Sequence, residues 1–176
     1  MDADGTDREA FSRLKNIELD IQNFVVEGHS LFLHSRITGN SKTSWALRLL
    51  NTYLNKIWVS SDLVCRGLFI NVPRFFISLK DSFSKSSDYV DHIKENVLSA
   101  DLVVFDEIGV KALTSFEMEQ LLSIVNARID AGKSNIYTSN LSEAEMKESV
   151  GDRLYSRVVN NSVNIELMGS DKRGLI

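Results

Sequence analysis

The chain has 176 residues, of which 43% are hydrophobic and 25% are charged, and its formal net charge is −4. This length and composition indicate one globular domain with a sizeable core. The negative charge argues against a protein coated by nucleic acid, although it allows a local basic strip that binds a single strand. The lone Cys65 excludes an intramolecular disulfide and a cysteine-rich zinc site, which agrees with a reducing compartment.

No window of the sequence approaches the roughly 18 uninterrupted apolar residues of a membrane span. Residues 1–5 are acidic and lack the basic and apolar regions of a signal peptide. We therefore expect a cytoplasmic protein with no membrane partner.

The first predicted element is an amphipathic helix over residues 7–26, because Phe11, Leu14, Ile17, Ile21 and Phe24 recur at helical spacing. A short apolar strand over residues 31–34 follows. It leads into a loop that ends in a Lys-Thr pair, and residues 42–58 then form the next predicted helix.

The loop after this strand resembles the phosphate-binding pattern G-x-x-x-x-G-K-[ST], in which backbone N–H groups cradle phosphate. Lys42 and Thr43 take the two side-chain roles, whereas the two glycine positions fall on Arg36 and Ser41. Gly39 is a glycine inside the loop, which many such loops also carry. The alternative for a lone Lys-Thr pair is an ordinary strand-turn-helix. The nucleotide-binding residues of this loop are predicted to be Thr38, Gly39, Asn40, Ser41, Lys42, Thr43 and Ser44.

A second motif favours the nucleotide interpretation. A strand is predicted over residues 67–72, Pro73 opens a helix, and residues 82–87 form a loop or helix break. A further helix then leads to an apolar strand that closes in Asp106 and Glu107, as a Walker B strand does. Asp106 can join Thr43 in holding Mg²⁺, and Glu107 can deprotonate the attacking water. The alternative is two solvated acids at a strand end.

Two later helices begin with capping-box patterns, Thr114 with Glu117 and Ser142 with Glu145, and Gly132 can end the first of them. Between them a strand over residues 135–139 ends at Asn140. Alternating strands and helices specify a parallel α/β sheet, in which ligands bind at the carboxyl ends of the strands.

The order of these pieces, from Lys42 and Thr43 through Asp106 and Glu107 to residues 138–140 and 151–157, resembles the AAA+ ATPase core of DnaC-like replicative helicase loaders, particularly those encoded by bacteriophages. The resemblance covers residues 11–173. It implies a P-loop NTPase with a central parallel sheet flanked by helices and no C-terminal lid. Residues 1–27 would be a helical lead-in and residues 28–176 the core.

The resemblance also implies cofactors, partners and roles. The cofactors are ATP and Mg²⁺, and the partners are a replicative helicase, single-stranded DNA and further copies of the chain. Asn140 would be the sensor that positions the hydrolytic water, and the alternative for it is a turn or cap residue. Arg157 would reach the nucleotide of the neighbouring subunit, with Arg153 as the alternative, and both arginines could instead be surface residues.

Single-stranded DNA contact is expected at Arg74 and Lys80, where the family carries a helical insertion, because basic and aromatic residues can pair phosphates and stack bases. The aromatic residues here have a competing role, since Phe76, Leu79 and Phe83 lie at helical spacing and are then expected in the core.

Two departures from the family leave three functions open. Family members usually begin with a helicase-binding region, so this chain is either a fragment or recruits its helicase differently. Ser41 also replaces a glycine that lets the backbone approach phosphate. The chain is therefore expected to be an ATP-driven loader, a nucleotide-dependent scaffold with impaired hydrolysis, or, less in keeping with its sequence, a small-molecule P-loop kinase.

Overall fold

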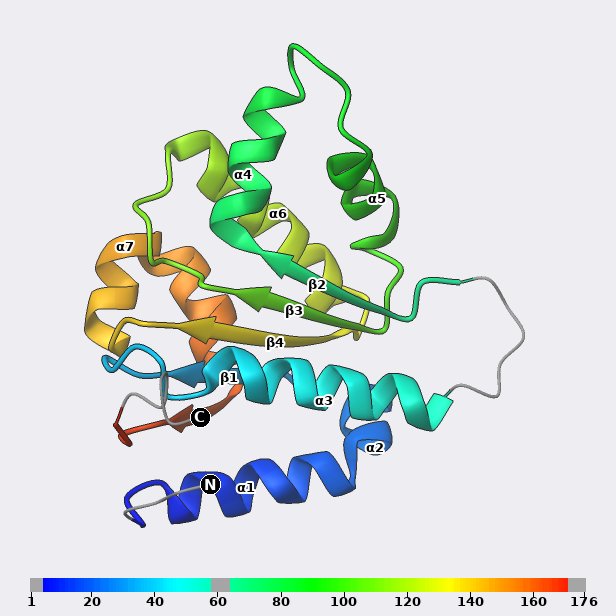
Figure 1. Ribbon diagram of the computed structural model, residues 1–176. Helices are drawn as coiled ribbons and strands as arrows, with labels where there is room; N and C mark the ends of the chain where they lie inside the picture. Colours follow the sequence, from blue (N-terminus) through cyan, green and yellow to red (C-terminus); the bar gives the residue numbers. More distant parts are fainter. Residues whose placement is uncertain (1–4, 58–63, 171–176) are drawn as a thin grey trace.

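Five parallel strands form one sheet in the order β2-β3-β4-β1-β5, as the computed structural model shows (Figure 1). The structure describes residues 5–57 and 64–170. The predicted parallel α/β class is thereby confirmed. The strands are β1 Leu31–His34, β2 Gly67–Asn71, β3 Leu102–Asp106, β4 Ser134–Ser139 and β5 Val163–Glu166.

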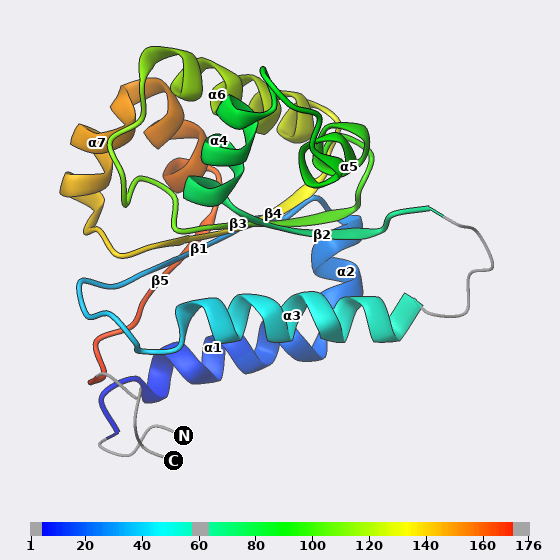
Figure 2. The same cartoon turned by 45° about the horizontal axis from the view of Figure 1, so that its top comes forward.

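Helices cover both faces of the sheet (Figures 1 and 2). One face carries α1 Arg8–Leu19, α2 Ile21–Val26 and α3 Lys42–Ile57. The other carries α4 Val72–Asp81, α5 Asp88–Asn96, α6 Ser115–Asp130, α7 Glu143–Tyr155 and the π-helical turn η1 Ser156–Asn160. Successive strand residues point to opposite faces, so Phe32 and Tyr137 enter the core under α6 and α7, whereas Leu31 and Ile136 enter the core under α3.

The strand order opens a crevice at the carboxyl end of β1. β1 lies between β4 and β5, and the chain leaves β1 into α3 on one face but leaves β4 into α7 on the other (Figure 2). Adjacent strands whose connections diverge in this way form a topological switch point, where open parallel sheets bind their ligands.

The predicted helix over residues 7–26 is two helices that meet at Asp20. Asp20 leaves helical geometry (φ −108°, ψ 26°), and its carboxylate accepts a hydrogen bond from Asn23 Nδ2 at 2.7 Å. Such local bonding lets aspartate compete with a continuous helix. Lys56 Nζ donates to the carbonyl oxygen of Leu19 at 2.6 Å and so satisfies the broken end.

Two further differences concern the core and the sheet. Phe83 is 74% exposed and lies 6.4 Å from the ring of Phe116, so its expected place in the core is wrong, whereas Phe76 and Leu79 are buried as expected. Trp58, the end of the predicted helix over residues 42–58, lies outside the described residues. β5 was not predicted, because only Ile165 in it is buried and the strand shows no clear pattern.

The helix ends follow the predicted signals. Thr114 with Glu117 and Ser142 with Glu145 both form complete capping boxes, in which each side chain bonds the other's backbone N–H. Gly132 follows α6 in the left-handed region (φ 64°). Across residues 5–57 and 64–170, every helix is too short or too polar to cross a membrane.

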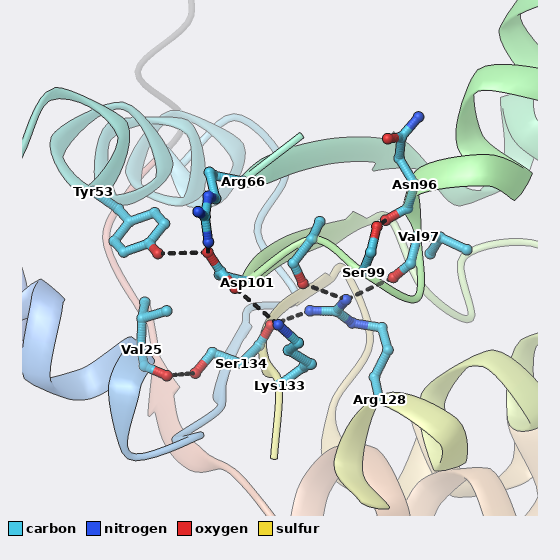
Figure 3. Close-up of polar contacts among 11 residues, drawn as sticks. Val25, Tyr53, Arg66, Asn96, Val97, Ser99, Asp101, Arg128, Lys133 and Ser134 are labelled. Carbon is cyan, nitrogen blue, oxygen red and sulfur yellow. Dashed lines mark hydrogen bonds and ion pairs between the residues drawn. The ribbon is translucent and has the colours of Figure 1, made fainter. Parts of the chain in front are cut away.

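A buried polar cluster fixes the opposite end of the sheet (Figure 3). Arg128 is fully buried on α6 and donates to the carbonyl oxygens of Val97, Ala100 and Ser134 at 2.6 to 2.8 Å, and its Nε donates to a side-chain oxygen of β4 at 2.6 Å. Burial lowers the pKa of Arg128 to about 10. This cluster ties α6 to the amino-terminal ends of the strands and leaves the carboxyl ends free to form a site.

A second group beside it centres on Asp101. Its carboxylate accepts hydrogen bonds from Lys133 at 2.8 Å, Tyr53 at 3.1 Å and Arg66 at 3.3 Å (Figure 3). Burial alone would raise the pKa of Asp101, but these three donors outweigh it and lower the pKa below its usual range.

Candidate functional site

The loop between β1 and α3 has the backbone shape of a phosphate-binding loop. Gly39 and Ser41 both lie in the left-handed region, with φ of 76° and 77°. This conformation costs a residue with a Cβ about 1–2 kcal/mol, which is why glycine is usual there. α3 starts directly after Ser41, and Trp45 N donates to Ser41 O at 2.9 Å. The N–H groups of the first turn of α3 are therefore oriented for an anion.

Lys42 follows the loop as the first residue of α3, and its side chain is buried. Its Nζ donates to Ile37 O and Asn40 Oδ1, each at 3.0 Å, and lies 3.5 Å from Ser35 O. Asn40 is fully buried, and its side chain bonds within the protein. Asn40 therefore offers a ligand only its backbone, whereas Lys42 brings a positive charge to the loop.

The acidic strand end meets the loop directly. Thr43 Oγ1 donates to Asp106 Oδ1 at 2.8 Å, and Thr138 Oγ1, from β4, donates to the same oxygen at 2.7 Å. Asp106 is 4% exposed. A hydroxyl and a carboxylate oxygen in contact, both hard oxygen ligands, fit the protein side of a Mg²⁺ shell.

Glu107 is held in a fixed position although it follows the end of the strand. Its backbone is left-handed (φ 61°), and its N–H donates to Thr138 Oγ1 at 3.0 Å. Asn71, the last residue of β2, donates from Nδ2 to Glu107 Oε2 at 3.0 Å and lies 3.4 Å from Asp106 Oδ2. Among the described residues, Ser41 and Glu107 are the two non-glycine residues with positive φ, and both belong to this site. Strained backbone of this kind is concentrated at functional sites.

A cleft of about 490 Å³ runs along these groups. It brings together the predicted loop, Glu107 and Asn140, which come from three separate parts of the sequence. The sequence alone predicts no role for Asn71 or Thr138. The signal for both was their position as polar residues at the carboxyl end of a buried strand. The cleft is lined by Thr38, Gly39, Asn40, Ser41, Lys42, Thr43, Ser44, Glu107, Thr138, Ser139 and Asn140.

His34, the last residue of β1, adds no positive charge to the site at neutral pH. Its ring stacks on Phe32 with 5.0 Å between centroids, and the side chain is buried. Burial lowers the pKa of His34 and outweighs the nearby carboxylates of Glu166 and Glu143, which act to raise it, whereas the Lys42 charge acts in the same direction as burial.

The two arginines considered for the nucleotide of a neighbouring subunit do not line this cleft. Arg153 and Arg157 line a separate hollow of about 560 Å³ with Leu122 and Asn126 of α6. Gly151 breaks α7 just before them (φ 74°, ψ 163°), and η1 begins at Ser156. Both arginines are exposed, and their side chains have no hydrogen bond or ion pair within the part of the chain that the structure describes.

The two residues predicted to contact DNA lie on α4, and neither of them lines the cleft. Arg74 is exposed, and its guanidinium lies 5.2 Å from the ring centroid of Tyr89. Lys80 forms an ion pair with the buried carboxylate of Glu117 at 3.0 Å. Lys80 therefore has a structural role that the sequence did not indicate.

The sequence of this chain resembles that of known proteins over part of its length. No family profile matches the chain. The replicative helicase loader DnaC of Escherichia coli (strain K12) is 27% identical over 103 residues, which is 57% of this chain and 42% of DnaC. The chain therefore matches less than half the length of that relative.

Solved structures agree on the fold. The DnaC helicase loader superposes with a TM-score of 0.68 at 23% identity, over 85% of this chain and 86% of that one. The replication initiator DnaA, bound to AMPPCP and single-stranded DNA, superposes with a TM-score of 0.73 at 17% identity, over 95% of this chain and 48% of that one. The chain is thus homologous to the DnaC-type replicative helicase loaders and has the AAA+ P-loop fold of the DnaC and DnaA cores.

Proposed function

We propose that this chain is an ATP-binding AAA+ protein of DNA replication that loads or remodels a replicative helicase on single-stranded DNA with ATP hydrolysis. Its homology to DnaC, a replicative helicase loader, supports the process. The DnaA core that shares its fold was solved with AMPPCP and single-stranded DNA, which supports the choice of ligands.

The observation that carries the nucleotide site is the contact between Thr43 and Asp106. These residues are 63 positions apart, yet Thr43 Oγ1 and Asp106 Oδ1 lie 2.8 Å from each other at the mouth of the loop. In P-loop NTPases a loop hydroxyl and a Walker B aspartate hold Mg²⁺ together. The residues present fit that ion, which would neutralise charge on the phosphates when bound.

The remaining roles follow from position along the cleft. Lys42 and the first turn of α3 bind the phosphates, and Glu107, fixed by Asn71, accepts the proton of the attacking water. Asn140 lines the same cleft and is proposed to orient that water.

Titration with a fluorescent ATP analogue and Mg²⁺ tests binding. We expect saturable binding that Lys42→Ala abolishes. Lys147→Ala is the matched control, because Lys147 is a surface lysine paired with Asp152 and lies outside the cleft. Equal binding by the Lys42→Ala variant would refute the site.

The arginine that completes hydrolysis is proposed to come from a second copy of the chain. Arg157 lines a different hollow from the nucleotide cleft, and so does its alternative Arg153. An arginine supplied in trans can raise turnover by about 10³–10⁵. If so, Lys42→Ala and Arg157→Ala are each inactive alone but recover activity when mixed. Failure to recover, with each variant folded, would argue against a shared site between copies.

Contact with single-stranded DNA is proposed for α4 through Arg74 and Lys80. Binding of a fluorescent oligonucleotide at several salt concentrations tests this, because each lost phosphate contact reduces the salt dependence of binding. Arg74→Ala should weaken binding and reduce the slope by about 0.7, and an unchanged slope would contradict the assignment.

The alternative is a nucleotide-dependent scaffold with impaired hydrolysis, and the left-handed Ser41 is the observation that favours it. Steady-state ATPase activity with and without single-stranded DNA separates the two functions. Nucleotide binding without turnover, with turnover restored by Ser41→Gly, would identify the scaffold.

A further inference from the structure

Asn40 uses its entire side-chain amide beneath the loop. Its Nδ2 donates to Leu167 O at 2.9 Å and to Ser35 Oγ, and its Oδ1 accepts from Lys42 Nζ at 3.0 Å. The residue is 0% exposed. A fully buried amide with both donors and its acceptor in use holds its own backbone in one place.

Leu167, whose carbonyl oxygen accepts the hydrogen bond of Asn40, is itself held in place. Leu167 N donates to His34 O at 2.9 Å, which continues the pairing of β5 with β1. The next two residues donate their N–H groups to one carboxylate, Met168 N to Asp7 Oδ1 at 2.6 Å and Gly169 N to Asp7 Oδ2 at 2.9 Å. Asp7 is 2% exposed. The anchor is therefore held both by the sheet and by the start of α1.

Ser41 lies between this anchor and α3. On its amino-terminal side is the immobilised Asn40, and on its carboxyl-terminal side Ser41 O accepts the hydrogen bond from Trp45 N that starts the helix. A serine can leave the left-handed region only by rotating its backbone, which would move one of these two neighbours. Unfavourable backbone geometry persists only where its surroundings hold it in this way.

We propose that Asn40 is a positioning residue that keeps Ser41 in the conformation usually supplied by glycine. The bond to Leu167 O and the first turn of α3 hold the loop from both sides, so its N–H groups stay oriented for phosphate. The proposal rests on the proposed nucleotide site and explains how that site keeps its shape with serine at position 41.

The test is a double-mutant cycle over positions 40 and 41, read by affinity for the fluorescent ATP analogue. With Ser41, Asn40→Ala should weaken binding about tenfold, because the loop relaxes out of its binding shape. In the Ser41→Gly background the same change should cost less than about threefold, because glycine adopts positive φ freely. Rescue by Ser41→Gly is an effect that a general loss of stability would not produce.

Asn135 provides the matched control. It is also a fully buried asparagine, its amide contacts Lys133 O and Ser30 Oγ, and its Oδ1 accepts from Arg128. It lies at the opposite end of β4 from the cleft. Asn135→Ala should destabilise the fold, leave analogue affinity unchanged and show no dependence on residue 41.

Two further measurements keep the proposal testable if Asn40→Ala fails to fold or if no variant binds the analogue. Asp7→Asn weakens the same anchor from outside and should reduce affinity about threefold in the parent protein but not in the Ser41→Gly background. Thermal unfolding reports the backbone strain at Ser41 without any nucleotide. Because Asn40 holds that strain in place, Ser41→Gly should raise Tm more in the parent protein than in the Asn40→Ala background.

The outcomes separate the two proposals. The role of Asn40 would be overturned, with the nucleotide site intact, if Asn40→Ala lost affinity equally in the parent and Ser41→Gly backgrounds. Equal Tm shifts from Ser41→Gly in the parent and Asn40→Ala backgrounds would overturn it too. Absence of binding by all variants, Ser41→Gly included, would overturn the nucleotide site, and the Tm comparison would still decide whether Asn40 holds Ser41.

Discussion

Asn71 joins the start of α4 to the carboxylates of the cleft, and its N-cap bond can be separated from the bonds of its amide donor. Its Oδ1 accepts from Arg74 N at 3.1 Å as the N-cap of α4, while its Nδ2 donates to Glu107 Oε2 at 3.0 Å. Serine at position 71 keeps an N-cap acceptor of similar quality but has no amide donor. Alanine removes the cap acceptor as well as the amide donor.

Losing the N-cap bond and losing the bond to Glu107 are expected to cost different free energies. Losing an N-cap costs about 1 kcal/mol of stability. Losing a hydrogen bond to a charged group costs about 1.5–3 kcal/mol, and if that bond positions the base, turnover falls about 10–100-fold. Glu107 depends on this bond because, among the described residues, its carboxylate accepts no other hydrogen bond.

The assay therefore compares two variants by two measurements. Asn71→Ser and Asn71→Ala should lose turnover equally, with little change in affinity for the ATP analogue. Their unfolding free energies should differ by about 1 kcal/mol in favour of serine. If Asn71→Ser retained full turnover, the amide would not position Glu107 and the reasoning would be refuted.

Three further predictions concern stability. Arg128→Met should lower the unfolding free energy by about 3–5 kcal/mol in urea titrations, since four buried acceptors lose their donor, and a loss under about 1 kcal/mol would contradict its anchoring role. The pKa of Asp101 is lowered from 3.8, so the carboxylate stabilises the fold above pH 3.8 and this stabilisation is lost as the pH falls through the folded pKa. Asp101→Asn should therefore reduce the loss of unfolding free energy at acid pH, and an unchanged loss would count against this role. Lys80→Ala should destabilise the fold by about 1 kcal/mol, because it leaves the buried Glu117 with fewer donors, and thermal unfolding that matches the parent protein would show that the ion pair contributes nothing.

The parts of the site that the sequence predicted are those whose residues are adjacent in the chain. The Lys42-Thr43 pair and the Asp106-Glu107 pair are each recognisable from adjacent residues. The rule that parallel strands end at one edge then brings them together, and the contact between Thr43 and Asp106 agrees with that rule.

The parts that the sequence did not predict depend on contacts distant in sequence. Asn71 reaches Glu107 across 36 positions, and nothing in a strand pattern says where an amide at its end will point. Arg128 has a charged side chain on a helix, which favours the surface, yet its buried acceptors come from the loop between α5 and β3 and from β4. Phe83 fits a helical repeat but follows the end of α4, so its ring stays exposed.

Each of the two strained residues of the cleft has an asparagine beside it. Ser41 follows Asn40, whose amide is bound to Leu167 O, and the carboxylate of Glu107 accepts the amide of Asn71, while its N–H is bound to Thr138 Oγ1. Each left-handed backbone costs about 1–2 kcal/mol, comparable to what one or two hydrogen bonds contribute. The strain of each residue is therefore of the same size as the hydrogen bonds beside it. Loss of either asparagine should release the residue that it holds before it unfolds the domain, so activity is expected to fail while the sheet remains intact.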